Sequence, residues 1–206
     1  MPSPHVGGTL RRCRQTQVPR GGSTQTMKIL AIPATNSPNG RNRRLVDHAA
    51  RLLEGGLIAD ATVDVLDLND YEMPLYSLRR QDDFGIPDAA QRFFDEIGAA
   101  DAVIVSFAEH NGSYTVAWKN VYDWASRIAM GVYQERKVAL FAAAPGARGG
   151  QGVLDHAVVV TPFFGGEVVG SLAIPRFDEH FDSVAGELVE PDLRARFEEI
   201  LAALGA

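Results

Sequence analysis

Residues 102–114, AVIVSFAEHNGSY, join an unbroken apolar run to a polar loop. The run from Ala102 to Phe107 has no charged side chain, which indicates a strand buried on both faces of a sheet. Residues 116–130 that follow are apolar at helical spacing. A buried strand, a loop and a helix in this order form the repeating unit of a parallel α/β sheet.

The same order recurs on both sides of this stretch. Strands are predicted at residues 28–32, 62–68, 138–144 and 168–174 in addition to 102–107, and helices at 42–54, 87–97, 116–130, 153–164 and 191–204. Five strands that alternate with five helices predict a doubly wound α/β domain with helices on both faces. Five strands favour the flavodoxin-like order 2-1-3-4-5 over the six-stranded dinucleotide-binding fold.

Two features of this pattern point beyond the fold. Residues 69–86 and 175–190 are long irregular stretches, and a loop of such length in a compact domain is usually functional or mobile. The helix at 116–130 has two apolar faces, with Lys119, Asp123 and Ser126 on a narrow polar stripe. Such a helix needs two partners, and we expect these to be its own sheet and a second subunit of a homodimer or homotetramer.

The chain has 206 residues, 46% hydrophobic and 22% charged, which fits one globular domain plus a tail. We assign residues 27–206 to the domain. Residues 1–26 are rich in Gly, Pro, Ser, Thr and Gln, and we predict a disordered extension. Two origins of the extension stay open: a start assigned upstream of Met27, and a basic targeting arm.

The net charge, the cysteine count and the lack of long apolar runs limit the partners and the cellular setting that we expect. The formal net charge of −6 argues against nucleic acid as the main partner, because phosphate neutralisation needs a basic face. Cys13 is the single cysteine, so no intramolecular disulfide can form and a reducing, cytoplasmic setting is the default expectation. No apolar run approaches the roughly 20 residues of a membrane-spanning helix, so we expect no membrane partner.

The expected strand order places the ligand site. Ligands of such sheets bind outside the carboxyl ends of the strands where the strand order reverses, here between the first and third strands. Three loops with unusual composition meet at that edge: residues 34–42, 108–114 and 144–150. This agreement between topology and composition predicts the functional site.

The first loop, ATNSPNGRN, ends at a helix N-terminus, where free backbone N–H groups and the helix dipole favour a phosphate. Thr35, Ser37 and Asn42 can add neutral donors. An ordinary β–α turn with capping Ser and Asn is the equally open alternative. No Lys follows a glycine as in the Walker motif, and no G-x-G-x-x-G follows the strand, so a nucleoside triphosphate or an NAD held in the Rossmann manner is disfavoured.

The second and third loops suit the edge of a planar heterocycle. Residues 109–114, EHNGSY, permit positive φ and expose backbone donors, and the glycine-rich residues 145–150 allow close backbone approach. A tight turn that needs glycine explains the third loop as well. A Ser/His/Glu hydrolase is disfavoured because there is no G-x-S-x-G elbow.

Histidines and carboxylates elsewhere give no second site. Asp178, Glu179, His180 and Asp182 match no defensible metal-ligand spacing, so we expect a solvated loop and no metal. His48 and His156 fall within predicted helices and are interpreted as surface or core residues.

The stretch from Ala100 to Arg127 resembles the NADPH-dependent FMN reductase family, whose hallmark is a Pro-Glu-Tyr-Asn-Gly-Ser loop before a helix with Lys-Asn and Asp-Trp. The matching residues here are Glu109, Asn111, Gly112, Ser113, Lys119, Asn120, Asp123 and Trp124. Residues 145–150 resemble the family's Pro-Gly-Gly-x-Gly-Gly turn, and residues 29–45 its Gly-Ser-x-Arg phosphate loop. The resemblance covers residues 27–206.

The resemblance implies bound FMN, NADPH or NADH as the reductant, and a flavin, quinone or similar small molecule as the electron acceptor. It implies no catalytic side chain, because the flavin carries the chemistry. The residues that it assigns to FMN are Thr35, Ser37, Arg41, Asn42, Glu109, His110, Asn111, Gly112, Ser113, Pro145, Gly146 and Gly149.

The chain departs from the family pattern at a few site positions. Ser37 stands where the family has Arg, Gly40 where a serine donor is usual, and Ala108 and His110 where it has Pro and Tyr. A positive charge for the phosphate is then missing unless Arg41 or Arg43 supplies it. These departures keep two alternatives open: a degenerate relative that has lost FMN, and an electron-transfer module without reductase turnover.

Overall fold

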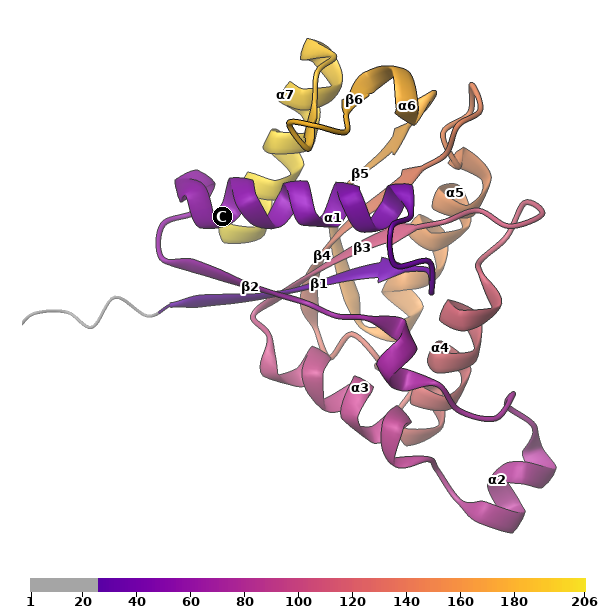
Figure 1. Ribbon diagram of the computed structural model, residues 1–206. Coiled ribbons are helices and arrows are strands. Elements are labelled where there is room, and N and C mark those ends of the chain that lie inside the picture. Colours follow the sequence, from indigo (N-terminus) through magenta and orange to yellow (C-terminus); the bar gives the residue numbers. More distant parts are fainter. Residues whose placement is uncertain (1–25) are drawn as a thin grey trace, which may run out of the picture.

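The computed structural model describes residues 26–206 and places five parallel strands in one sheet of order β2-β1-β3-β4-β5 (Figure 1). The predicted strand order and fold class are confirmed. The strands are β1 Met27–Ala34, β2 Ala61–Val65, β3 Ala102–Phe107, β4 Arg136–Ala143 and β5 Gly166–Ile174. The predicted disorder of residues 1–26, and Cys13, lie outside the described residues except for Thr26.

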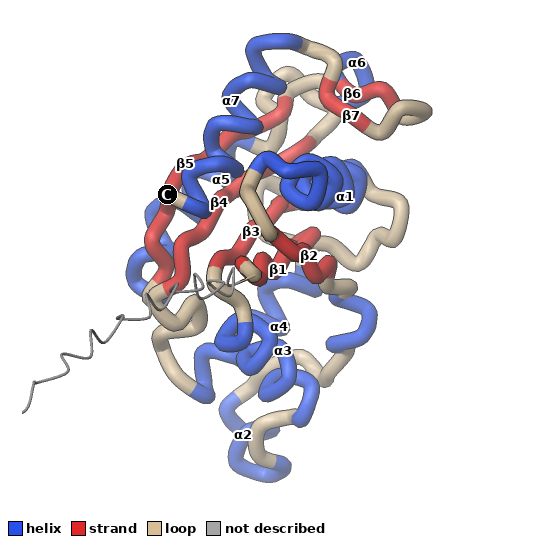
Figure 2. The backbone as a smooth tube through the Cα atoms, turned by 90° about the vertical axis from the view of Figure 1, so that its left-hand side faces the viewer, coloured by secondary structure: helices blue, strands red, loops and turns tan. Residues whose placement is uncertain are grey.

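Two helical layers cover the sheet (Figure 2). Alternate residues of β1 show how: Leu30 and Ile32 face one buried cluster, while Ile29 and Ala31 face the other. The first cluster is closed by α3 Asp88–Ala99, α4 Val116–Ile128 and α5 Gln151–Val160. The second is closed by α1 Arg41–Leu52 and α7 Pro191–Ala202.

The two long irregular stretches contain structure that the sequence did not predict. Residues 69–86 hold a 3-10 turn at Leu68–Tyr71 and the helix α2 Leu78–Phe84. Residues 175–190 hold α6 Phe177–His180 and a hairpin of β6 Phe181–Asp182 and β7 Glu187–Leu188. No residue of α2 is buried, so this helix lacks the apolar face that a sequence pattern reveals.

The second apolar face of α4 has a packing partner within the chain itself, and the expected subunit contact at this helix stays a prediction. Trp124 is 1% exposed, and its Nε1 donates to the carbonyl of Pro74 at 2.7 Å. The ring of Tyr76 meets that of Trp124 edge to face at 5.1 Å. Ser126, expected on the polar stripe, is also buried. The segment before α2, with Pro74 and Tyr76, is therefore a packing partner of the second apolar face of α4.

His48 is a core residue of α1. Its ring is 2% exposed, stacks on Phe197 with 5.5 Å between centroids, and accepts a long 3.5 Å bond from the backbone N–H of Leu188 at Nε2. Burial first, then the charges of Arg51 and Arg194, lower the pKa of His48 from 6.5 to about 4.

This shift predicts an acid-sensitive fold. Between pH 6.5 and about 4 the unfolded chain binds a proton at His48 that the folded chain excludes, so stability present above pH 6.5 is lost as the pH falls. The loss is about 3 kcal/mol over this window. Urea unfolding across this pH range measures it, and His48→Gln should flatten the pH dependence by that amount. An unchanged pH profile in the variant would contradict the assignment.

Candidate functional site

The three predicted loops meet at the carboxyl ends of β1, β3 and β4. They enclose a small pocket of about 160 Å³. The residues that line it are Thr35, Ser37, Gly40, Arg41, Asn42, Ala108, Glu109, His110, Ala143, Ala144 and Pro145. Topology and composition therefore predicted correctly that these loops meet around a pocket, and its role as the functional site stays a prediction.

The N-terminus of α1 opens into this pocket without a side-chain cap. Gly40 is its N-cap residue and contributes no side chain, so the N–H groups of the first turn are unpaired within the helix. The loop before it is held by two bonds: the N–H of Ser37 donates to Thr35 Oγ1 at 3.2 Å, and that of Gly40 to the carbonyl of Ser37 at 3.1 Å. Free donors at the positive end of a helix dipole favour an anion here.

Asn42 uses its side chain to hold the sheet. Its Oδ1 accepts from Ser106 Oγ at 2.8 Å and from the N–H of Ala143 at 2.9 Å, while Nδ2 donates to the carbonyl of Ala143 at 3.1 Å. These bonds fix α1 against β3 and β4. They occupy Oδ1 and one of the two N–H groups of the amide, so the expected donation to a phosphate would rest on the other N–H.

The second loop is a tight turn whose tip lies outside the pocket. His110 and Ser113 exchange backbone bonds of 2.9 and 3.1 Å, and Asn111 and Gly112 between them have φ of 53° and 77°. Positive φ at both central residues is the type I′ geometry that Asn-Gly favours. Asn111, Gly112 and Ser113 are exposed and line neither the small pocket nor the larger one described below.

Glu109 caps α5. Its Oε1 accepts from the backbone N–H of Val153 at 3.0 Å, close to the Cα of Gly152. The carboxylate therefore fixes the second loop to the helix that follows the third.

Gly146 and Gly149 of the third loop have roles in the backbone conformation of the turn. The carbonyl of Gly146 accepts from the N–H groups of Gly149 and Arg176 at 3.1 and 3.0 Å. Gly149 has a φ of 60° and packs against the peptide between Ile174 and Pro175. Neither glycine lines the pocket, whereas Pro145 does. The alternative of a turn that needs glycine explains Gly149.

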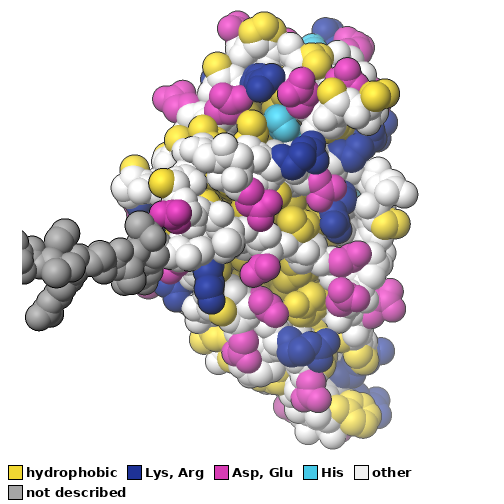
Figure 3. All heavy atoms as spheres, turned by 60° about the vertical axis from the view of Figure 1, so that its left-hand side comes forward, with side chains coloured by type: hydrophobic (Ala, Val, Ile, Leu, Met, Phe, Trp, Pro, Cys, Tyr) yellow, Lys and Arg dark blue, Asp and Glu magenta, His cyan; other side chains and the backbone are white. Residues whose placement is uncertain are grey.

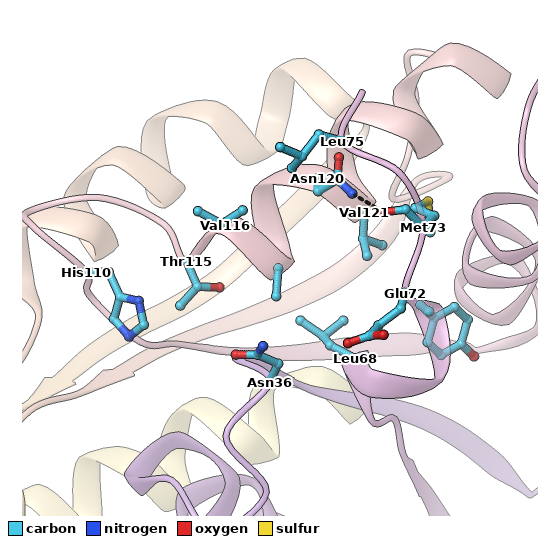
Figure 4. Close-up of a pocket in the computed structure, with 12 residues that line it drawn as sticks. Asn36, Leu68, Glu72, Met73, Leu75, His110, Thr115, Val116, Asn120 and Val121 are labelled. Atoms are coloured by element: carbon cyan, nitrogen blue, oxygen red, sulfur yellow. Dashed lines mark hydrogen bonds between the residues drawn. The ribbon is translucent and has the colours of Figure 1, made fainter. Parts of the chain in front are cut away.

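A larger pocket of about 510 Å³ adjoins the small one, and His110 lines both (Figure 4). Its other walls come from the first loop, the stretch after β2 and the start of α4. They are Asn36, Leu68, Tyr71, Glu72, Met73, Leu75, Thr115, Val116, Ala117, Asn120 and Val121. Apart from His110, sequence reasoning assigned none of them to the site, and the length of the irregular stretch 69–86 was the signal for several.

Two polar side chains of the larger pocket are already engaged within the protein. Thr115 Oγ1 donates to the carbonyl of Ala34 at 3.0 Å and caps α4, and Asn120 bonds to the backbone of Met73 and Tyr76. Figure 4 shows the carboxylate of Glu72 directed toward Leu68 and Asn36. The groups left for a ligand include the amide of Asn36, the hydroxyl of Tyr71, the carboxylate of Glu72 and the ring of His110, beside an apolar wall.

The sequence of this site has known relatives. The profile of the NADPH-dependent FMN reductase family matches residues 27–179. The chain belongs to this family. An NAD(P)H-dependent FMN reductase of Pseudomonas aeruginosa is 29% identical over 178 residues, which cover 82% of this chain and 92% of that protein. A probable NADPH:quinone oxidoreductase of Oryza sativa subsp. japonica is 26% identical over 188 residues, 89% of this chain and 90% of that protein.

A solved structure shares the fold of this FMN reductase family member. FerB, a flavoenzyme NAD(P)H:(acceptor) oxidoreductase from Paracoccus denitrificans, superimposes with a TM-score of 0.67 over 87% of this chain and 96% of FerB, at 19% identity. The predicted resemblance, the enzyme class and the FMN and NAD(P)H cofactors are confirmed at the level of the family.

The acidic residues after β5 have local partners in this FMN reductase. Asp178 pairs with Arg41, and Asp182 Oδ1 accepts from the N–H groups of Val184 and Ala185. His180 Nδ1 lies 2.9 Å from the carbonyl of Pro175. Within residues 26–206 no three ligand-type side chains gather as a metal site would require, and no helix has the length and apolarity to cross a membrane.

Proposed function

We propose that this chain binds FMN with its phosphate in the small pocket and its ring toward the larger one, and that it passes electrons from NAD(P)H to a neutral quinone. One observation carries the proposal: an anion-binding helix N-terminus and a half-apolar pocket adjoin each other and share His110. A small-molecule site with a charged end and a flat apolar body needs both.

The donors of the small pocket fit a phosphate. The free N–H groups at the start of α1 supply the main contacts, and the exposed hydroxyl of Ser37 adds another. The hydroxyl of Thr35 accepts a hydrogen bond from the N–H of Ser37 and so stabilises the shape of this loop. FMN, when bound, supplies the electron transfer, and the protein supplies position and electrostatic environment.

The larger pocket suits a neutral acceptor. Val116, Ala117 and Val121 provide an apolar wall, and Asn36 and His110 provide donors for a carbonyl oxygen. Glu72 is the one carboxylate among the residues that line it, and no Lys or Arg lies among them. A carboxylate disfavours anionic acceptors, so we infer a quinone rather than a sulfonated dye.

A homo-oligomer and a cytoplasmic location belong to the same proposal. Four large apolar side chains of this region are exposed: Leu75 and Val116, which line the larger pocket, and Leu78 and Phe84 of α2. A patch of this kind is typical of a subunit contact. With α4 covered by its own chain, the contact is expected at α2 and the start of α4 rather than along the length of α4.

The visible spectrum of the purified protein tests this function. We expect flavin bands that survive desalting after FMN is added and that bleach with NADPH under anaerobic conditions. Retained bands that do not bleach would support an electron-transfer module instead. Failure to retain flavin even at high FMN would support a degenerate relative and contradict the proposal.

A further inference from the structure

The basic side chain that lines the small pocket is already paired. Arg41 begins α1, and its guanidinium donates to Asp178 through Nε at 3.1 and 3.0 Å and through Nη2 at 2.6 Å. Arg44 Nη2 lies 3.9 Å from the same carboxylate. The hydrogen bond from Arg41 lowers the pKa of Asp178, which keeps the carboxylate ionised at neutral pH.

Asp178 is held beside the pocket by its backbone. The N–H of Arg176 donates to the carbonyl of Gly146 at 3.0 Å, and that of Phe177 to the carbonyl of Ala144 at 3.1 Å. The ring of Phe177 is fully buried in the core. The carboxylate next to it therefore has a defined place over the third loop, and it faces α1. Figure 3 shows acidic and basic side chains interspersed on one face of the molecule.

The other two arginines near the start of α1 also have side-chain partners. Arg43 bonds to Asp47 through Nε at 2.9 Å, and Arg44 donates to Ser183 Oγ at 2.9 Å. Neither lines the small pocket, whereas Arg41 does. A phosphate that enters this pocket therefore meets a cation whose Nε–Nη2 edge is already taken by a carboxylate.

We propose that Asp178 competes with the ligand phosphate for Arg41, and so sets how strongly the site prefers a phosphorylated flavin over an unphosphorylated one. This inference rests on the proposed FMN site and adds its phosphate selectivity. A carboxylate and a phosphate can both use the Nε–Nη2 edge of a guanidinium, because both accept bidentate charge-assisted bonds, and each also lessens the positive charge that the other meets. Binding of the phosphate frees Asp178 and loosens one contact between α1 and the segment 175–190.

Two ligands and a matched variant test the competition. FMN and riboflavin differ only by the phosphate, and their Kd values are measured from flavin fluorescence on flavin-free protein. Asp178→Asn should tighten FMN about tenfold and leave riboflavin unchanged. Glu179→Gln is the control, because Glu179 is exposed, follows Asp178 in α6 and loses the same charge. It should shift FMN by less than about twofold.

Arginine variants complete the cycle. Arg41→Gln should weaken FMN about tenfold, and the double variant should match Arg41→Gln because Asp178 acts only through Arg41. Equal shifts for FMN and riboflavin in Asp178→Asn, or equal shifts in Asp178→Asn and Glu179→Gln, would overturn the inference. Unchanged FMN binding in Arg41→Gln would do the same.

Inorganic phosphate separates failure of this inference from failure of the proposed function. If wild-type protein binds neither flavin, the proposed function fails, and phosphate at constant ionic strength becomes the probe. Phosphate should then raise the Tm of Asp178→Asn more than that of Glu179→Gln. Equal Tm shifts would overturn the competition as well.

Discussion

Replacement of Gly149 by alanine is expected to lower the free energy of unfolding by about 3–5 kcal/mol. Gly149 has a φ of 60°, which strains any residue with a Cβ. A Cβ there would lie 2.5 Å from the nitrogen of Pro175 and 2.6 Å from the carbonyl carbon of Ile174. Both neighbours are backbone atoms at the end of β5, so they cannot rotate away as a side chain can.

Gly146→Ala is the matched control, three residues earlier in the same loop. A Cβ at Gly146 meets no atom within 4 Å. We expect a change within about 0.5–1 kcal/mol, with stabilisation possible because alanine restricts the unfolded chain. Urea unfolding followed by circular dichroism compares the two. Equal losses of stability in both variants would refute the packing explanation for Gly149.

The strands were predictable because burial on both faces leaves a signature. The strand at 102–107 was predicted at its observed ends, since a parallel strand between two helical layers is uniformly apolar. The order of the strands followed from their number and alternation. By contrast, α2 escaped prediction because it is stabilised by a cap from Ser77 and by the pair Arg79–Asp83, and both lie on the surface.

The sequence predicted which three loops meet around the small pocket, but the roles of their side chains were less readable. Asn42 and Glu109 are polar residues in the expected loops, yet each uses its side chain within the fold. A sequence pattern cannot separate a polar group that meets a ligand from one that meets a distant backbone N–H, because the partner of Asn42 is 101 residues away. The same limit applies to Gly149, whose neighbour is the end of β5.

The larger pocket could not be predicted from the sequence for a related reason. Glu72, Met73 and Leu75 belong to a stretch without helical or strand periodicity. Their positions depend on Asn120 and Trp124, which bond to the backbone of this stretch from α4. These bonds hold the irregular segment in place as a wall of the pocket. Asn120 and Trp124, which match the family pattern, therefore shape the pocket through the segment that they hold.

Ser37→Glu is expected to weaken FMN roughly 100-fold. Ser37 is exposed and lines the small pocket, so a carboxylate at this position would lie beside a bound phosphate dianion. At a separation of about 5 Å a unit charge repels a dianion by about 3 kcal/mol, for a dielectric constant between those of water and a protein surface. Riboflavin lacks the dianion, and its Kd should change less than about threefold.

Two variants of the same loop complete this test. Ser37→Arg should tighten FMN about tenfold, since it adds a cation whose donors are not already paired with Asp178. Asn39→Glu adds the same charge as Ser37→Glu on an exposed residue that does not line the pocket, and should weaken FMN only slightly. If Ser37→Glu and Asn39→Glu weaken FMN equally, the phosphate does not bind at the start of α1. If Ser37→Glu weakens and Ser37→Arg tightens FMN binding as expected, the phosphate lies against this loop. The backbone N–H donors at the start of α1 then compensate for the arginine that the family has at position 37.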